Sequence, residues 1–231
     1  MIDINEIILW KPLKVVSVII FLVALLLIPM SSFWAMITLF VLICLWSRVP
    51  CLISMFTKDL DVIDFFVVML GIHVGGIFGG LFGGIVMMFT RIFGPNEWFL
   101  YTIKDSISLV ICGFLTPLFY SMFGSALYTL YAFTALRWVI YLILTAILEP
   151  EYMGLELMLC TIGGFKSYLY NTFVMNTFEG HLTNLFIGGV KFNMGLLLFT
   201  GSIIGVFFLI ARMGNYLEKV MPQKEVPLFV K

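Results

Sequence analysis

The chain has 231 residues, of which 62% are hydrophobic and 11% are charged, and its formal net charge at pH 7 is +0. Soluble domains carry about 25% charged residues, so this composition excludes an ordinary soluble domain, and the charge balance gives no sign of a nucleic-acid surface. Continuous apolar runs approach the roughly 20 residues that cross a bilayer as a helix, whereas a β-barrel needs short alternating segments.

The apolar runs predict an all-α, polytopic transmembrane helical bundle that forms one membrane domain over residues 1–231. Its expected spans, in chain order, are 14–30, 33–47, 65–93, 106–123, 125–148 and 192–211. Pro50 ends the second run, because proline lacks an N–H and disfavours helix before it. The segment 51–64 mixes charged and apolar residues, which is typical of an interfacial helix or an ordered loop.

The third expected span is rich in glycine. The glycines recur every fourth residue in two series, which are Gly71, Gly75, Gly79 and Gly83, and then Gly76, Gly80 and Gly84. Small residues four apart let a second membrane helix approach to backbone contact, so we expect a glycine zipper or one wall of a cavity. The 29 residues from 65 to 93 would extend about 43 Å as a helix, which predicts strong tilt or a break among the glycines.

Residues 155–175 are more polar than a lipid-facing span. They form a seventh span sheltered inside the bundle, a re-entrant segment or a short helix facing a cavity, and a polar loop is expected after them. Positive residues in short flanks set the orientation. With six spans, Arg48 and Lys58 lie on the same side as the basic tail, which predicts that both termini are in the cytoplasm. The expected location of the protein is the plasma membrane.

Ionisable residues at membrane depth are the main functional candidates, since burying charge is costly. Arg137 lies near the middle of its span and should face a cavity or pair with a carboxylate, Asp64 or Glu156. His73 borders the second glycine series, and Lys166 follows two glycines. Structural alternatives remain open: an internal ion pair for Arg137, a backbone hydrogen bond for His73, and an interfacial position for Lys166.

These considerations define two sets of candidate residues. The first set suits a small amphipathic or anionic ligand, and its predicted substrate-binding members are His73, Arg137, Lys166, Tyr168, Asn171 and Asp64. The second set is predicted to pack helices, and it comprises both glycine series together with Gly201 and Gly205, which repeat the four-residue spacing in the last span.

The sequence carries no motif of a soluble enzyme: neither a nucleotide-binding loop nor a zinc-protease or serine-hydrolase motif is present. The two histidines, His73 and His181, are far apart and do not form the pair that a haem in a membrane bundle would need. The four cysteines lack C-x-x-C spacing and indicate buried thiols. We therefore expect no enzymatic activity, no metal and no cofactor.

The outline of the chain resembles the substrate-binding S components of energy-coupling factor vitamin transporters. The resemblance covers about residues 61–193 and rests on about six helices, little extramembrane mass and a glycine-rich third span that ends in Phe93-Gly94-Pro95. It implies a vitamin-like ligand held between helices and a partner complex of a coupling protein with ATPases. In that family a small-residue face on the first helix docks the coupling protein, whereas here residues 15–20 lack one and the last span carries it.

Three hypotheses follow for the function. The first is a small-molecule uptake subunit, which predicts a ligand-sized cavity lined by Arg137, Lys166 and His73. The second is a structural or assembly subunit whose glycine faces contact other membrane chains. The third, an enzyme acting on a lipid-linked substrate through Asp61, Asp64 and Arg137, lacks the paired acidic motif of metal-dependent chemistry and ranks last.

Overall fold

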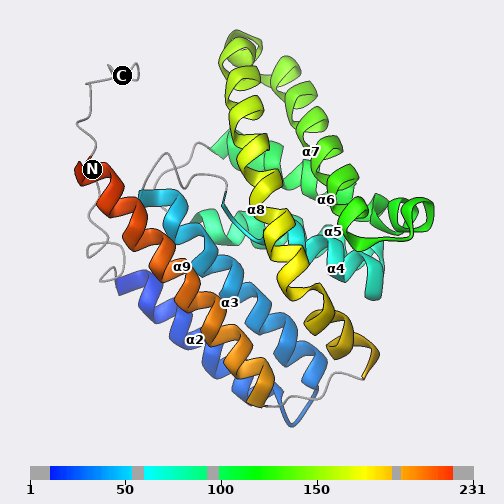
Figure 1. Ribbon diagram of the computed structural model, residues 1–231, viewed down its shortest axis with the longest axis vertical. Coiled ribbons are helices and arrows are strands. Elements are labelled where there is room, and N and C mark those ends of the chain that lie inside the picture. The colour runs from blue at the N-terminus through cyan, green and yellow to red at the C-terminus, as the bar shows by residue number, and fades with distance from the viewer. Residues whose placement is uncertain (1–10, 54–59, 93–98, 189–193, 221–231) are drawn as a thin grey trace.

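The computed structural model describes residues 11–53, 60–92, 99–188 and 194–220, and within these ranges the chain is all-helical, as predicted (Figure 1). The α-helices are α2 (Lys11–Leu27), α3 (Ser32–Ile53), α4 (Ile63–His73), α5 (Gly76–Ile92), α6 (Phe99–Phe123), α7 (Ala126–Leu148), α8 (Met153–Ile187) and α9 (Met194–Val220). A short 3₁₀ turn, η1 (Pro150–Tyr152), joins α7 to α8.

Helix α4 is the centre of the bundle. It packs against α5, α6, α7 and α8, and every residue from Ile63 to Gly71 is buried. Helices α2, α3 and α9 lie side by side as one group, in which α3 packs against both α2 and α9, and α6, α7 and α8 form the opposite group (Figure 1). The short, strongly apolar α4 is thus enclosed on all sides, as a helix without a polar face must be.

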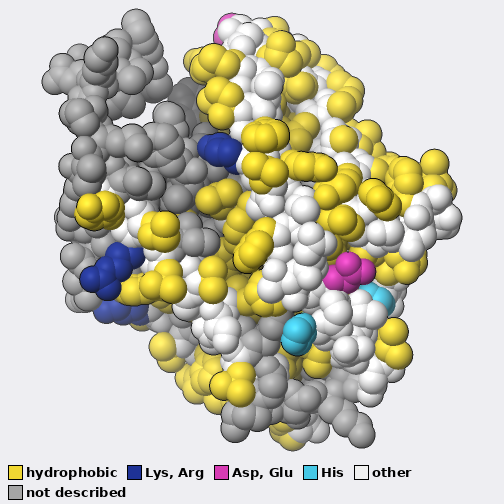
Figure 2. Space-filling view, viewed as in Figure 1, with side chains coloured by type: hydrophobic (Ala, Val, Ile, Leu, Met, Phe, Trp, Pro, Cys, Tyr) yellow, Lys and Arg dark blue, Asp and Glu magenta, His cyan; other side chains and the backbone are white. Residues whose placement is uncertain are grey.

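Three of the described helical segments are long and apolar enough to cross a membrane: Ser32–Pro50, Phe99–Phe123 and Ala126–Leu148. Hydrophobic side chains cover much of the visible surface of α7 and α8, and charged side chains are few there (Figure 2). Exposed apolar residues such as Ile143 and Phe165 make up this surface. Because water disfavours such a surface, length, composition and exposure are together compatible with a membrane location.

The expected span 65–93 is two helices instead of one. Gly75, with φ +127°, occupies the turn between α4 and α5, a conformation that residues with a Cβ rarely adopt. The two helices then run antiparallel. A Cβ built on Gly79 would lie 2.8 Å from Gly71 N, and one built on Gly83 would lie 2.6 Å from Val67 Cγ2. The break that the span length indicated therefore falls at the second glycine of the first series.

The other glycine series of α5 lies against α6. A Cβ on Gly80 would be 2.6 Å from Val110 O, and one on Gly84 would be 2.5 Å from Val110 Cγ2. Gly76 lies against the Phe114 carbonyl, and Gly113 lies against the Gly80 backbone. Helix α5 therefore uses its two bare faces for two different neighbours, α4 and α6. Gly201 and Gly205 differ, since a Cβ on either would meet no described atom within 4 Å.

Three other boundaries differ from the sequence interpretation. Helix α3 continues through Pro50 to Ile53, and α6 begins at Phe99, before the expected start of its span at 106. Residues 155–175 belong to one continuous helix, α8, which also includes most of the expected polar loop. No Pro or Gly-Pro pair interrupts α8, so its polar residues remain helical until Gly188. Part of the segment 51–64 lies outside the described residues.

Candidate functional site

Arg137 is the centre of a buried ion network between four helices. Its guanidinium on α7 donates to Asp64 Oδ1 on α4 and to Asp105 Oδ1 on α6, the latter at 3.2 Å. Arg91, at the end of α5, pairs with the other oxygen of Asp105. The sequence-based pairing of Arg137 with Asp64 is therefore confirmed. The network joins α4, α5, α6 and α7 where an unpaired charge would be costly.

A second ion pair extends this charged end of the bundle to α3. Arg48 Nη1 lies 3.1 Å from Asp61 Oδ2, and both side chains are buried. Asp61 Oδ1 also accepts from the Ile63 amide at 3.2 Å, which satisfies one of the free N–H groups at the start of α4. Asp61 therefore fixes the entry of α4 against the end of α3.

Lys104 forms a third ionic group, and its side chain is completely buried. Its Nζ lies 2.7 Å from Glu149 Oε2, 3.1 Å from Thr145 Oγ1 and 3.9 Å from Glu156 Oε1. The same ammonium lies 4.8 Å from the centroid of the Tyr141 ring, a cation–π distance. Glu156, the alternative partner of Arg137, thus pairs with Lys104 instead. Lys104 lies between the expected spans 65–93 and 106–123, and the sequence interpretation missed this role.

The other predicted substrate-binding residues do not join Arg137. His73 lies at the opposite end of α4, where its ring stacks on Phe186 with centroids 4.9 Å apart and its Nε2 lies 3.4 Å from Thr183 Oγ1. Nine residues of helix, about 13 Å, separate His73 from Asp64. These contacts suit a packing role for His73.

The three predicted residues on α8 also have different surroundings from one another. Tyr168 is exposed and packs on the Tyr131 ring at 4.5 Å. Asn171 is buried and donates from Nδ2 to Ser167 Oγ at 3.1 Å. Lys166 is half-buried. The predicted set is therefore distributed over both ends of α4 and along α8, and Arg137 and Asp64 are the two members that an ion pair joins.

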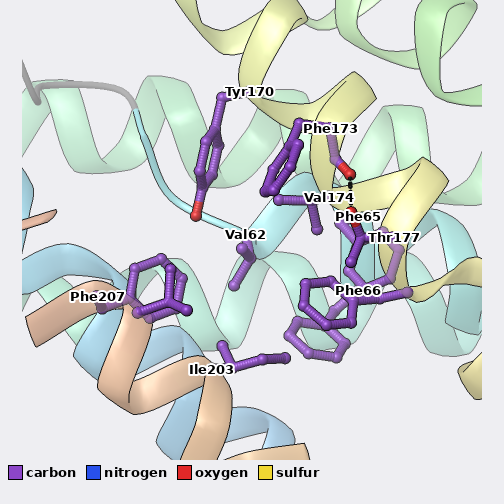
Figure 3. A pocket seen from close by; sticks show the side chains of 11 residues that line it. Val62, Phe65, Phe66, Tyr170, Phe173, Val174, Thr177, Ile203 and Phe207 are labelled. Carbon is purple, nitrogen blue, oxygen red and sulfur yellow. Dashed lines mark hydrogen bonds between the residues drawn. The ribbon is translucent and has the colours of Figure 1, made fainter. Parts of the chain in front are cut away.

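A cavity of about 240 Å³ lies between α4, α8 and α9 (Figure 3). Its side chains are mostly aromatic or aliphatic, and they are Val62, Phe65, Phe66, Tyr170, Phe173, Val174, Thr177, Phe178, Ile203, Val206 and Phe207. None of these described lining residues is Lys, Arg, His, Asp or Glu. The sequence predicted a cavity lined by Arg137, Lys166 and His73, and none of the three lines this one. In the sequence, the cavity could have been indicated only by the spacing of three and five residues between Tyr170, Phe173 and Phe178 on α8. Many helices that simply pack against a neighbour have the same spacing.

Fold and site define an all-helical protein with candidate membrane-spanning helices, a buried ion network at one end of its central helix and an apolar cavity beside that helix. Among the described residues, no group of three or more His, Cys, Asp or Glu side chains is placed to hold a metal ion. In comparisons with known proteins, no family model, no curated protein and no solved structure matches this chain.

Proposed function

We propose that the chain is the membrane-embedded substrate-binding subunit of a small-molecule uptake transporter, with its ligand in the cavity between α4, α8 and α9. The aromatic cavity carries this proposal. A dry apolar cavity of about 150 Å³ binds benzene, so about 240 Å³ accommodates about ten non-hydrogen atoms. That is the size of a bicyclic aromatic or a single substituted ring, a vitamin-like ligand.

The ligand of this cavity is uncharged. Its described lining contains no Lys, Arg, His, Asp or Glu, and the Thr177 hydroxyl already donates to the Phe173 carbonyl at 2.7 Å. An unpaired charge there would be strongly disfavoured. Arg137, the residue that favoured an anionic ligand, is already engaged by Asp64 and Asp105. The proposed ligand is therefore a small neutral molecule held within the bundle, in place of the anionic ligand that the sequence favoured.

The position of the cavity suits ligand entry. Helix α9 packs along α3, while α8 packs along α4 and α7, so the cavity lies where the two helix groups meet (Figure 3). Small relative movements of packed groups open such boundaries. Partner ATPases with a coupling protein would drive this movement in the plasma membrane, with both chain termini in the cytoplasm.

Filling the cavity should abolish binding of a probe of matching size. We expect the full chain in lipid nanodiscs to bind 1-fluoronaphthalene saturably, with a ¹⁹F resonance distinct from that of lipid-dissolved probe. Val174 is buried in the lining, so Val174→Phe should weaken binding at least tenfold. Val139→Phe, on an exposed position of α7, is the matched control. Unchanged affinity in Val174→Phe would place the probe elsewhere.

A structural or assembly subunit is the second candidate, and one observation favours it. Gly201 and Gly205 on α9 are exposed, and a Cβ on either would meet no described atom within 4 Å. Leu198 and Leu209 on the same helix are also largely exposed. Small residues four apart in a bilayer permit close approach of another helix, so this face of α9 would contact a different membrane chain.

Under this second candidate, Gly205→Leu should release partner subunits. The measurement is affinity purification in mild detergent with mass spectrometry of the retained proteins. Gly180→Leu is the matched control, because Gly180 on α8 is equally exposed and open. Co-purification that survives Gly205→Leu would rule out this face as the contact. Retained ATPase subunits would favour the transporter, whereas a stable assembly without an ATPase would favour the structural subunit.

A further inference from the structure

The interface between α7 and α8 buries several polar side chains. Two contacts set its register: Thr172 Oγ1 lies 3.1 Å from the Tyr131 hydroxyl, and a Cβ built on Gly164 would lie 3.3 Å from Trp138 Nε1. Residue numbers rise along α7 as they fall along α8, so the helices run antiparallel. About 10 Å of helix separates the two contacts.

Buried polar groups from both helices lie between these two contacts. On α7, Thr134 lies one turn beyond Tyr131 and one turn before Trp138, and it is 5% exposed. On α8, Ser167 and Asn171 lie between Gly164 and Thr172, and they are 4% and 1% exposed. Both helices therefore contribute buried polar side chains to one short section of their interface.

Three polar atoms in this section have no hydrogen-bond partner among the described residues: Thr134 Oγ1, Trp138 Nε1 and Asn171 Oδ1. Asn171 uses its amide nitrogen for Ser167, which leaves its oxygen to accept. The indole N–H only donates, and a threonine hydroxyl does both. Buried polar groups are rarely left unsatisfied, and internal water is their usual partner when protein atoms do not reach them.

We propose that this section of the α7–α8 interface is a site for internal water, which accepts from Trp138 and donates to Asn171 and Thr134. The absence of a side chain at Gly164 provides space beside the indole N–H, where an added Cβ would come within 3.3 Å. The three orphan groups supply the two to four polar partners that a buried water needs. This inference does not depend on the proposed transport function.

The site lies next to the buried carboxylates of the bundle. Tyr141 follows Trp138 by three residues on α7, and its hydroxyl donates to Glu156 Oε1 at 3.4 Å. Glu156 in turn lies 3.9 Å from Lys104 Nζ. On α8, Glu156 is eight residues from Gly164, so water beside Trp138 lies about two helical turns from the Lys104–Glu156 pair.

X-ray hydroxyl-radical footprinting of the full chain in nanodiscs tests the proposal, because bound water is radiolysed in place and labels the side chain beside it. Trp138 should be modified at least fivefold faster than Trp46. Both indoles are half-buried, but Trp46 Nε1 already donates to Ser17 Oγ at 3.1 Å. An equal or slower rate at Trp138 would overturn the proposal.

Two sets of variants distinguish a bound water from loose packing of the α7–α8 interface. Gly164→Ala should lower the Trp138 labelling rate at least threefold, because the methyl group takes the space of the water, while Gly180→Ala on the same helix should leave it unchanged. Thr134→Val removes the hydroxyl at constant shape. It should lower the melting temperature by several degrees if water satisfies that hydroxyl. A higher melting temperature would show that the hydroxyl is unsatisfied and would overturn the site.

Discussion

Arg137→Met should reduce the free energy of unfolding by about 3–5 kcal/mol, the usual cost of removing one partner from a buried ion pair. The variant would leave Asp64 without its cation and Asp105 with Arg91 alone. Because Asp64 is almost completely buried on the central helix, water cannot replace the guanidinium. Unfolding in mixed detergent micelles, followed by circular dichroism, measures the loss.

Two further variants identify the cause of this loss. Arg212→Met removes an exposed cation from α9 and should change stability by less than about 0.5 kcal/mol. The double variant Arg137→Met, Asp64→Leu removes both partners and should be less destabilised than the sum of the single variants. Additive losses would mean that Arg137 and Asp64 act independently, against the contact that joins them.

Gly80→Leu should prevent α5 and α6 from packing. The first added carbon would already lie 2.6 Å from Val110 O, which is backbone and cannot move away alone. Gly113, on the opposite side of the contact, lies against the Gly80 backbone, so no space is available there. Overpacking by a few methylene groups costs about 1–3 kcal/mol or more. Because Gly80→Leu must separate two backbones, we expect it to lower the free energy of unfolding by at least about 3 kcal/mol.

The comparison with Gly201→Ala isolates the packing effect. Gly201 has nothing described within 4 Å of an added Cβ, and alanine favours helix over glycine by about 1 kcal/mol. We therefore expect Gly201→Ala to be neutral or slightly stabilising, and Gly80→Ala to be destabilising in the same unfolding assay. Equal effects of the two alanine variants would contradict the close approach of α5 and α6.

Some of this structure was predictable because a single physical cost determined it. Continuous apolar runs predicted helices, and the cost of charge at membrane depth predicted a carboxylate partner for Arg137. The length of the run 65–93 indicated a tilt or a break. The position of the break, at Gly75, depended on a positive φ. The other glycines of the series could have adopted this conformation equally well.

The missed features depend on contacts between segments distant in the chain. Lys104 precedes an apolar run and resembles a connecting residue, yet it is buried because Glu149 reaches it across 45 positions of sequence. The cavity has the same origin. Val62, Val174 and Ile203 come from three regions of the chain, and its existence depends on how α8 and α9 are placed beside α4. Residue spacing within one helix contains no such information.

The distribution of charges in the ion network also constrains how the protein is made. Asp64 and Asp105 leave the ribosome before Arg137, and a buried charge without its partner is costly. Neither carboxylate has its full set of partners until α7 arrives. A nascent chain that ends after α6 can already pair Asp105 with Arg91, but Asp64 lacks its cation until α7 is made.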